Sequence, residues 1–214
     1  MNQNKPDNDR PRARPAEAEQ RNLKTSILDV AEELFTEHGY AATSIRHIAE
    51  RAGVNPALVH YYFDNKKTLL QTVMERVLEP LGQAIATMGA DKQASPETIA
   101  GLLLSMASTH PNIPRLLIRE VMLPGGEMQE YFISNLAPHL GGALPALLEK
   151  EKTAGRLRQN ADPAISAMMI MAMCVFPFIA RTLAEPVLGI RFDKRGIELM
   201  NQQITELLRQ GLTR

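Results

Sequence analysis

The fold is decided by the stretch TSIRHIAERAGVNPALVHYYFDNK, residues 43–66, which we interpret as two short helices joined by a tight turn. Thr43 can cap the first helix by accepting amide hydrogens through its hydroxyl, and Ile45 and Ile48 then recur on one helical face. Gly53 has the backbone freedom to stop a helix. The first helix is therefore expected to end just before this glycine.

The second helix begins with Asn55 and Pro56, because asparagine is a good N-cap and proline at the first helical position loses no hydrogen bond. Val59 and Phe63 are four residues apart and are expected to face the core. This leaves the outward face to the side chains of Ala57, His60, Tyr61 and Tyr62. In a helix-turn-helix the second helix enters the major groove, where such groups can read base edges or hold phosphates.

Composition places the chain among globular proteins but leaves its partner open. Of the 214 residues, 44% are apolar, and 24 basic residues balance 24 acidic ones. Net charge therefore argues neither for nor against a nucleic-acid partner. Within the motif, basic side chains outnumber acidic ones, with Arg46, Arg51, Lys66 and Lys67 against Glu50 and Asp64. A locally basic reading face is expected.

Cysteine usage and hydropathy bear on the compartment. The single cysteine, Cys174, excludes an internal disulfide, which is typical of a reducing cytoplasm. No apolar run follows Met1, so no secretory signal is expected. The most apolar segment, residues 164–184, contains Pro177 and Arg181, and we interpret it as a helix buried among other helices rather than a membrane span. We expect a cytoplasmic protein without membrane contact.

The chain divides into three parts. Residues 1–20 are polar and rich in proline, and we expect a disordered arm. We favour a solvated tail over an arm that contacts DNA. Residues 21–81 hold an amphipathic helix ended by Gly39, the two helices of the motif, and a fourth helix without a breaker before Pro80. Residues 82–214 are expected to form a larger helical domain, so the predicted fold class is all-α.

The larger domain has no alternation of period two, so no strand is expected there. Glycine and proline divide it into helices near residues 95–109, 112–122, 127–154, 162–184 and 194–210. Pro138, Gly141, Gly142 and Pro145 predict a kink or a split in the third of these helices. An uneven helical wall is a common way to make room for a ligand.

The last two predicted helices are candidates for an oligomer interface. Residues 164–184 are apolar nearly all round, and the final helix carries a broad apolar stripe. Burial inside one domain and burial against a second copy both satisfy this pattern. We favour a homodimer through these two helices, because a helix-turn-helix gains affinity from two half-sites related by two-fold symmetry.

The run TSIRHIAERAGVNPALVHYYFDNKKTLL, preceded by ILDVAEELFTEHGYAA, resembles the DNA-binding domain of the TetR/AcrR family of bacterial transcriptional regulators. The likeness covers residues 21–81 and rests on fixed spacing of Phe35, Gly39, Thr43, Ile48, Ala49, Gly53, Val54, Tyr61, Phe63, Lys66 and Leu69. The resemblance implies an all-helical homodimer that binds double-stranded operator DNA and holds an effector pocket in each larger domain. Beyond residue 81 only this arrangement carries over.

Position by position, the resemblance implies phosphate contacts from Thr43, Ser44, Tyr61, Tyr62 and Lys66. It implies base-edge reading by Arg46, Asn55, Ala57 and His60. His60 departs from the family, which most often has tyrosine there, and histidine allows a different base preference. For two of these residues an alternative stays open. Tyr62 can pack against the first helix of the motif instead of contacting phosphate, and Arg46 can pair with Glu50 one turn away instead of reading a base.

Candidate pocket residues combine methionine and phenylalanine with polar groups in the larger domain, because methionine adapts to irregular ligands. The predicted effector pocket comprises Met106, His110, Arg119, Tyr131, Asn135, His139, Met169, Met173 and Phe176. The same apolar residues at helical spacing also fit a plain core. We expect a small, largely apolar effector.

Signatures of catalysis are missing from the sequence, which has no nucleophile with a base, no glycine-rich phosphate loop and no metal cluster. His110 and His139 lack the spacing of metal ligands, so we expect no metal and no cofactor. The favoured function is a sequence-specific DNA-binding transcriptional regulator, a repressor that a small effector releases from its operator. An activator, or a nonspecific architectural DNA-binding protein, is the alternative.

Overall fold

The structure, a computed structural model, describes residues 17–90 and 94–213. Of the predicted arm at residues 1–20, the part up to residue 16 lies outside the described residues, and residues 17–20 are helical. Within the described residues the only β-type pairing is an isolated bridge between Leu157 and Thr213. The predicted all-α class is confirmed.

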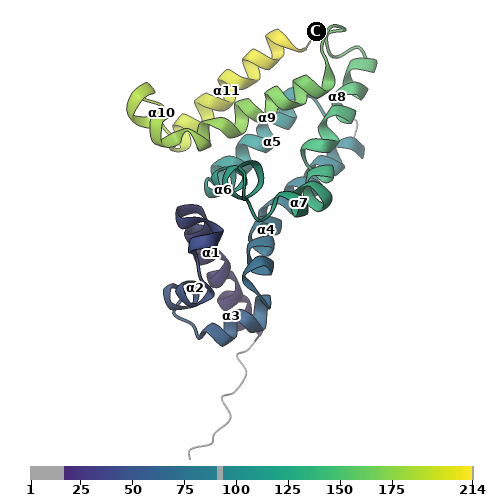
Figure 1. The fold of residues 1–214 in the computed structure, drawn as a ribbon. Coiled ribbons are helices and arrows are strands. Elements are labelled where there is room, and N and C mark those ends of the chain that lie inside the picture. Colours follow the sequence, from purple (N-terminus) through teal and green to yellow (C-terminus); the bar gives the residue numbers. More distant parts are fainter. Residues whose placement is uncertain (1–16, 91–93, 214) are drawn as a thin grey trace, which may run out of the picture.

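Three helices form a small unit at one end of the molecule (Figure 1): α1 (Glu17–Ala42), α2 (Ile45–Arg51) and α3 (Pro56–Phe63). Ile27 and Phe35 on α1 pack in one core with Ile48 on α2 and Val59 on α3, and all four are fully buried. Gly39, at φ 82° and ψ 170°, interrupts the regular backbone of α1. The predicted helix end at this glycine and the predicted second helix are confirmed.

Helix α4 (Lys66–Ala90) runs from the small unit into the larger one (Figure 1). Pro80 lies inside it but is exposed, and the helix continues past it to Ala90, so that its whole length is 25 residues. Arg76 on α4 binds Asp29 at 2.6 Å and Glu32 at 2.7 Å, both on α1. The proposed domain boundary after residue 81 therefore falls within a continuous helix that is itself fixed to α1.

The larger unit is built around α5, which packs against α9 and α11, while α9 also packs against α8 (Figure 1). These helices are α5 (Pro96–Thr109), α8 (Leu144–Thr153), α9 (Pro163–Ile179) and α11 (Lys194–Gly211). Cys174 lies in this core and donates from Sγ to the carbonyl of Ala100 at 3.4 Å. Burial raises the pKa of the Cys174 thiol to about 12, so the group is an unreactive thiol within the core.

Between α5 and α8 the chain forms short helical pieces of several kinds. They are α6 (Asn112–Leu117), the π-helix η1 (Ile118–Met122), α7 (Gln129–Tyr131), the π-helix η2 (Phe132–Leu136), and the 3₁₀ turns η3 (Ala137–His139) and η4 (Gly141–Ala143). The predicted split of the helix near residues 127–154 is confirmed. We call residues 111–143 the interrupted segment.

A continuous helix over residues 162–184 was expected, and this prediction is wrong. Helix α9 ends at Ile179, and α10 (Arg181–Leu188) departs from it at an angle of 77°. Pro177 lacks the N–H that would extend the hydrogen-bond ladder through the last turn of α9. No single described helix is long and apolar enough to cross a bilayer, and α9 and α10 reach the required length only together, across this bend.

Candidate nucleic-acid interface and ligand cavity

Helix α2 is capped by Ser44, whose Oγ accepts a hydrogen bond from the His47 N–H at 3.1 Å. The predicted cap at Thr43 is wrong. Thr43 is 1% exposed, and its hydroxyl is directed at the carbonyl oxygens of Leu34, 3.1 Å away, and Gly39, 2.8 Å away. Its hydroxyl hydrogen is therefore used within the small unit, whereas the exposed Ser44 hydroxyl keeps a hydrogen available for a phosphate.

The Lys66 ammonium is held at the start of α4 by the turn between α1 and α2. Its Nζ donates to the carbonyls of Tyr40 at 2.7 Å and Thr43 at 2.9 Å, and lies 4.1 Å from the centre of the Tyr40 ring. Two of its three hydrogens are thus engaged internally. The predicted phosphate contact of Lys66 stays a prediction, but the ammonium already joins α4 to the turn between α1 and α2. That turn leads into the reading unit, by which we mean α2, α3 and the turn between them.

Helix α3 divides into a buried and an exposed face, as the sequence predicted. Ala57 and His60 are exposed, and the Tyr61 side chain is 75% exposed. Tyr62 is half-buried and packs against the core, with its ring 5.3 Å from that of Tyr61 in an edge-on arrangement. Packing of Tyr62 against the first helix of the motif stays a prediction, and Tyr61 is the more accessible of the two tyrosines.

His60 is oriented by the residue that ends its helix. Its Nδ1 lies 2.8 Å from the carbonyl oxygen of Asp64. Because a carbonyl only accepts hydrogen bonds, this contact assigns the proton to Nδ1 and leaves Nε2 as an acceptor when the ring is neutral. An acceptor in the major groove suits the exocyclic amino group of adenine or cytosine.

Two further predicted readers are also accessible. Asn55 is exposed and caps α3, with Oδ1 accepting from the Ala57 N–H at 2.9 Å, so its amide Nδ2 stays free to donate. Arg46 is exposed on α2. Within the part of the chain that the structure describes, Arg46 and Glu50 form no ion pair, so this alternative is not supported.

Arg119 was predicted to line a pocket, and that prediction is wrong. Its guanidinium lies against the end of α1, where it donates to the carbonyls of Glu37 at 3.2 Å and His38 at 2.6 Å. The neighbouring Glu120 is 4% exposed and accepts from the Tyr40 N–H at 3.0 Å. Arg119 and Glu120 of the interrupted segment therefore bind the backbone that leads into the reading unit.

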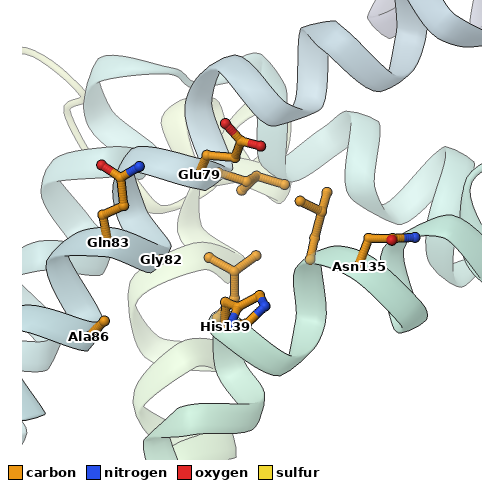
Figure 2. Close-up of a pocket in the computed structure, with 9 residues that line it drawn as sticks. Glu79, Gly82, Gln83, Ala86, Asn135 and His139 are labelled. Atoms are coloured by element: carbon orange, nitrogen blue, oxygen red, sulfur yellow. The ribbon is translucent and has the colours of Figure 1, made fainter.

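One hollow of the larger unit lies between α4 and the η2–η3 region, with a volume of about 440 Å³ (Figure 2). Its walls are Leu78, Glu79, Gly82, Gln83, Ala86, Asn135, Leu136, His139 and Leu140. Asn135 and His139 were predicted from the sequence. Glu79 and Gln83 were missed, because alternate turns of exposed polar residues on a helix are typical of a solvated face.

The remaining predicted pocket residues do not converge on this hollow. Met106 and His110 line a separate cavity of about 230 Å³ between α4 and α5. Met173 is half-buried against the core, whereas Met169 and Phe176 are 55% and 62% exposed. The single nine-residue pocket is therefore wrong, because helical residues four or seven apart share one face and α9 directs that face outward.

Tyr131 lies near the hollow without lining it, and its hydroxyl donates to the carboxylate of Glu75 on α4. Burial, then this hydrogen bond, then the charges of Glu75 and Glu79 raise the pKa of Tyr131 to about 12. The phenol therefore stays protonated and fixes α7 to the middle of α4.

A three-helix unit with a capped, accessible second motif helix defines the class of helix-turn-helix DNA-binding proteins. Residues 27–73 match the family described as bacterial regulatory proteins, tetR family, and residues 97–209 match the tetracyclin repressor-like C-terminal domain. The chain belongs to the tetR family of bacterial transcriptional regulators, as the resemblance of residues 21–81 predicted.

Individual relatives are more distant. The probable HTH-type transcriptional regulator YttP of Bacillus subtilis is 30% identical over 112 residues, which are 50% of this chain and 54% of that protein. The HTH-type transcriptional repressor NicS of Pseudomonas putida is 25% identical over 197 residues, covering 89% of this chain and 92% of its own length. The structure of SmeT of Stenotrophomonas maltophilia with triclosan has a TM-score of 0.68 at 22% identity, covering 90% of this chain and 92% of that one, which is a likeness of fold.

Proposed function

We propose that this chain is a dimeric repressor that binds operator DNA through α3 and is released by a small effector. The observation that carries the proposal is the division of α3. Val59 and Phe63 are buried, while His60 and Tyr61 present hydrogen-bonding groups on the helix that enters the groove. NicS is a transcriptional repressor, and SmeT, a repressor with this fold, binds triclosan. These two relatives support repression for this chain, and SmeT also supports binding of a small molecule.

Helix α4 offers a direct mechanical connection between effector and DNA. It begins at Lys66, which holds the turn before α2, and it lines the hollow from Leu78 onward. At 1.5 Å per residue these two points are about 20 Å apart on one helix. An effector that displaces α4 at the hollow changes the separation of the two reading units in a dimer, and both can then no longer fit their half-sites.

The dimer is proposed to form through α9 and α11, with α10 beside them. Large apolar side chains are exposed along these helices, namely Ile165, Met168, Met169, Phe176, Leu183, Val187, Leu188, Leu199 and Leu207. On α9 the first four follow helical spacing and form one stripe. An exposed apolar stripe of this kind is typical of a subunit interface, and a two-fold axis would cover it with its own copy.

The interface is tested with one charge placed on α11. Leu207→Asp puts a carboxylate in the proposed stripe, and we expect sedimentation equilibrium to report monomers at concentrations where the unmodified protein is dimeric. Asn201→Asp is the matched control, because this exposed residue lies about 120° round the helix from Leu207 and about 160° from Leu199. If both variants remained dimeric, the interface would lie elsewhere.

Sequence-specific binding is tested by selecting bound fragments from the host genome and measuring their affinity as salt rises. A specific regulator keeps its preference for the selected fragment against excess competitor DNA, whereas a nonspecific binder loses it. A reporter behind the selected fragment should be transcribed more strongly when the gene for this chain is deleted. Loss of fragment preference would overturn the DNA-binding proposal, and weaker transcription would indicate an activator.

A further inference from the structure

The hollow between α4 and the η2–η3 region combines an apolar floor with a polar rim. Leu78, Leu136 and Leu140 form the floor and are 2%, 6% and 6% exposed. Gly82 lets the two walls approach, since a Cβ at this position would lie 3.3 Å from the carbonyl oxygen of His139. The volume of about 440 Å³ falls within the range of small-molecule sites.

The rim offers hydrogen-bonding side chains and one carboxylate. Figure 2 shows Glu79 and Gln83 on α4 and, across the hollow, Asn135 and His139 on the η2–η3 region. Asn135 already donates from Nδ2 to the carbonyl of Tyr131 at 3.0 Å, so its Oδ1 is the part left for a ligand. The Glu79 carboxylate accepts only, and Gln83 has an amide oxygen one turn away.

The charge at this rim is negative. Among the described residues, the walls of the hollow contain no lysine and no arginine, and Glu79 is their only carboxylate. Glu75 lies one turn earlier on α4, and the charges of Glu75 and Glu79 both contribute to raising the pKa of Tyr131. The field of the two carboxylates therefore extends over the wall next to Asn135, where a cation is favoured and an anion is repelled.

We infer that this hollow binds a small amphiphilic amine, whose apolar body covers the three leucines and whose ammonium group lies against Glu79. The inference rests on the proposed function, since it names the chemical class of the effector. It refines the expected largely apolar effector by adding a positive charge, because the walls carry the Glu79 carboxylate and no lysine or arginine to balance it. The ammonium would contact α4 itself, the helix that begins at Lys66.

Three probes with one carbon skeleton test the inference on the full-length dimer: 4-phenylbutylamine, 4-phenylbutanol and 4-phenylbutyrate. Binding is measured by isothermal titration calorimetry at low salt. A partly exposed charge pair changes affinity by about threefold. Reversing the sign of the ligand charge doubles that free-energy difference, so we expect the amine to bind about tenfold tighter than the carboxylate, with the alcohol between them.

Two variants assign this preference to the hollow. Glu79→Gln keeps the shape of the side chain and removes its charge, and we expect it to reduce the preference for amine over carboxylate to about twofold or less. Glu149→Gln removes an exposed carboxylate on α8, outside the hollow, and should retain the full preference. Equal binding of the three probes, no binding of any, or an unchanged preference in Glu79→Gln would overturn the inference.

Operator affinity is measured separately, with each probe at saturation. Amine binding that depends on Glu79 supports the ligand class whether or not DNA is released. If the amine binds in this way but operator affinity is unchanged, the release mechanism fails and the ligand assignment stands. If the amine does not bind while the selected operator is still recognised, the ligand assignment fails and the DNA-binding function stands.

Discussion

Helices α2 and α3 each begin on a side-chain cap, Ser44 for one and Asn55 for the other. Six helical pieces follow one another in the interrupted segment, residues 111–143, and none of them has a side-chain cap. The reading unit is thus stabilised by hydrogen bonds between residues two or three apart in sequence. The interrupted segment depends on partners far along the chain.

Those distant partners lie on α1 and α4. Arg119 and Glu120 bind the backbone around residues 37–40, and Tyr131 binds Glu75. Glu127 forms an ion pair with Lys67 at 3.0 Å, next to the reading unit. The comparison suggests that DNA contact needs a rigid local frame, whereas a segment whose contacts cross between units can respond to a ligand.

The largest expected effect comes from Gly39, where the two regions meet. Its φ of 82° and ψ of 170° suit only glycine, and a Cβ would lie 2.3 Å from Nε of Arg119. We expect Gly39→Ala to lower the free energy of unfolding by about 2–4 kcal/mol, from backbone strain and from displacement of the Arg119 hydrogen bonds. Urea unfolding measures the change.

Gly53→Ala is the matched control. Gly53 also has a positive φ, 67°, but a Cβ there would meet nothing within 4 Å. It should cost about 1 kcal/mol, the left-handed backbone penalty alone. Equal losses for the two alanine variants would show that the contact between Arg119 and α1 contributes nothing.

A second test concerns DNA reading by His60. We expect His60→Ala to lose about 1–3 kcal/mol of operator binding, confined to one base-pair position, because Nε2 accepts from a single base. The measurement is fluorescence anisotropy on the selected operator and on single-base variants of it. A loss of equal size on every sequence would contradict a base-reading role and indicate a phosphate contact instead.

A smaller loss of stability should distinguish the reading unit, whose helices have side-chain caps, from the interrupted segment, whose helices have none. Ser44→Ala removes the Oγ that accepts from His47, and we expect a loss of about 1 kcal/mol in unfolding free energy. Ser134→Ala, at an exposed serine in η2, should change stability by less than about 0.5 kcal/mol. Chemical denaturation of both variants measures the two losses. An equal loss of unfolding free energy at the two serines would show that the cap at Ser44 does not stabilise the reading unit.

The last effect is confined to alkaline pH and concerns the titration of Tyr131. Its pKa is raised from the ordinary 10.0 to about 12, so folding favours the protonated phenol. The stabilisation is fully present below the ordinary pKa and is lost as pH rises from there through the raised value. The stability difference between the unmodified protein and Tyr131→Phe should therefore narrow across that range. Tyr61→Phe, on the exposed face of α3, is the control, and a difference independent of pH would contradict the assignment.

Sequence reasoning succeeded where the controlling contacts are local. The start of α3 at Asn55 and Pro56, and the interruption of α1 at Gly39, follow from capping and from glycine's backbone freedom. It failed at Thr43, whose hydroxyl could cap a helix but is instead engaged by Leu34 and Gly39. No property of residue 43 distinguishes the two outcomes before the neighbouring carbonyls are placed.

The same reason explains the ligand site. Asn135 and His139 could be proposed as polar residues in an apolar domain, but Glu79 could not, because an exposed glutamate on a helix normally faces water. Only the approach of the η2–η3 region to α4 turns that glutamate into part of a cavity wall. Arg119 was assigned to a pocket for the converse reason, since its partners lie about eighty residues earlier in the chain.

The sequence by itself determined the helix-turn-helix, the cap of α3 at Asn55, the all-α class and the family, because these depend on spacing and on interactions within a few residues. Only the tertiary structure decided which polar side chains are free. Lys66 and Arg119 hold backbone carbonyls, whereas His60 and Glu79 remain open to a base and to a ligand. The physical reason is that a hydrogen bond needs both partners in place, and these partners meet only when separate helices pack.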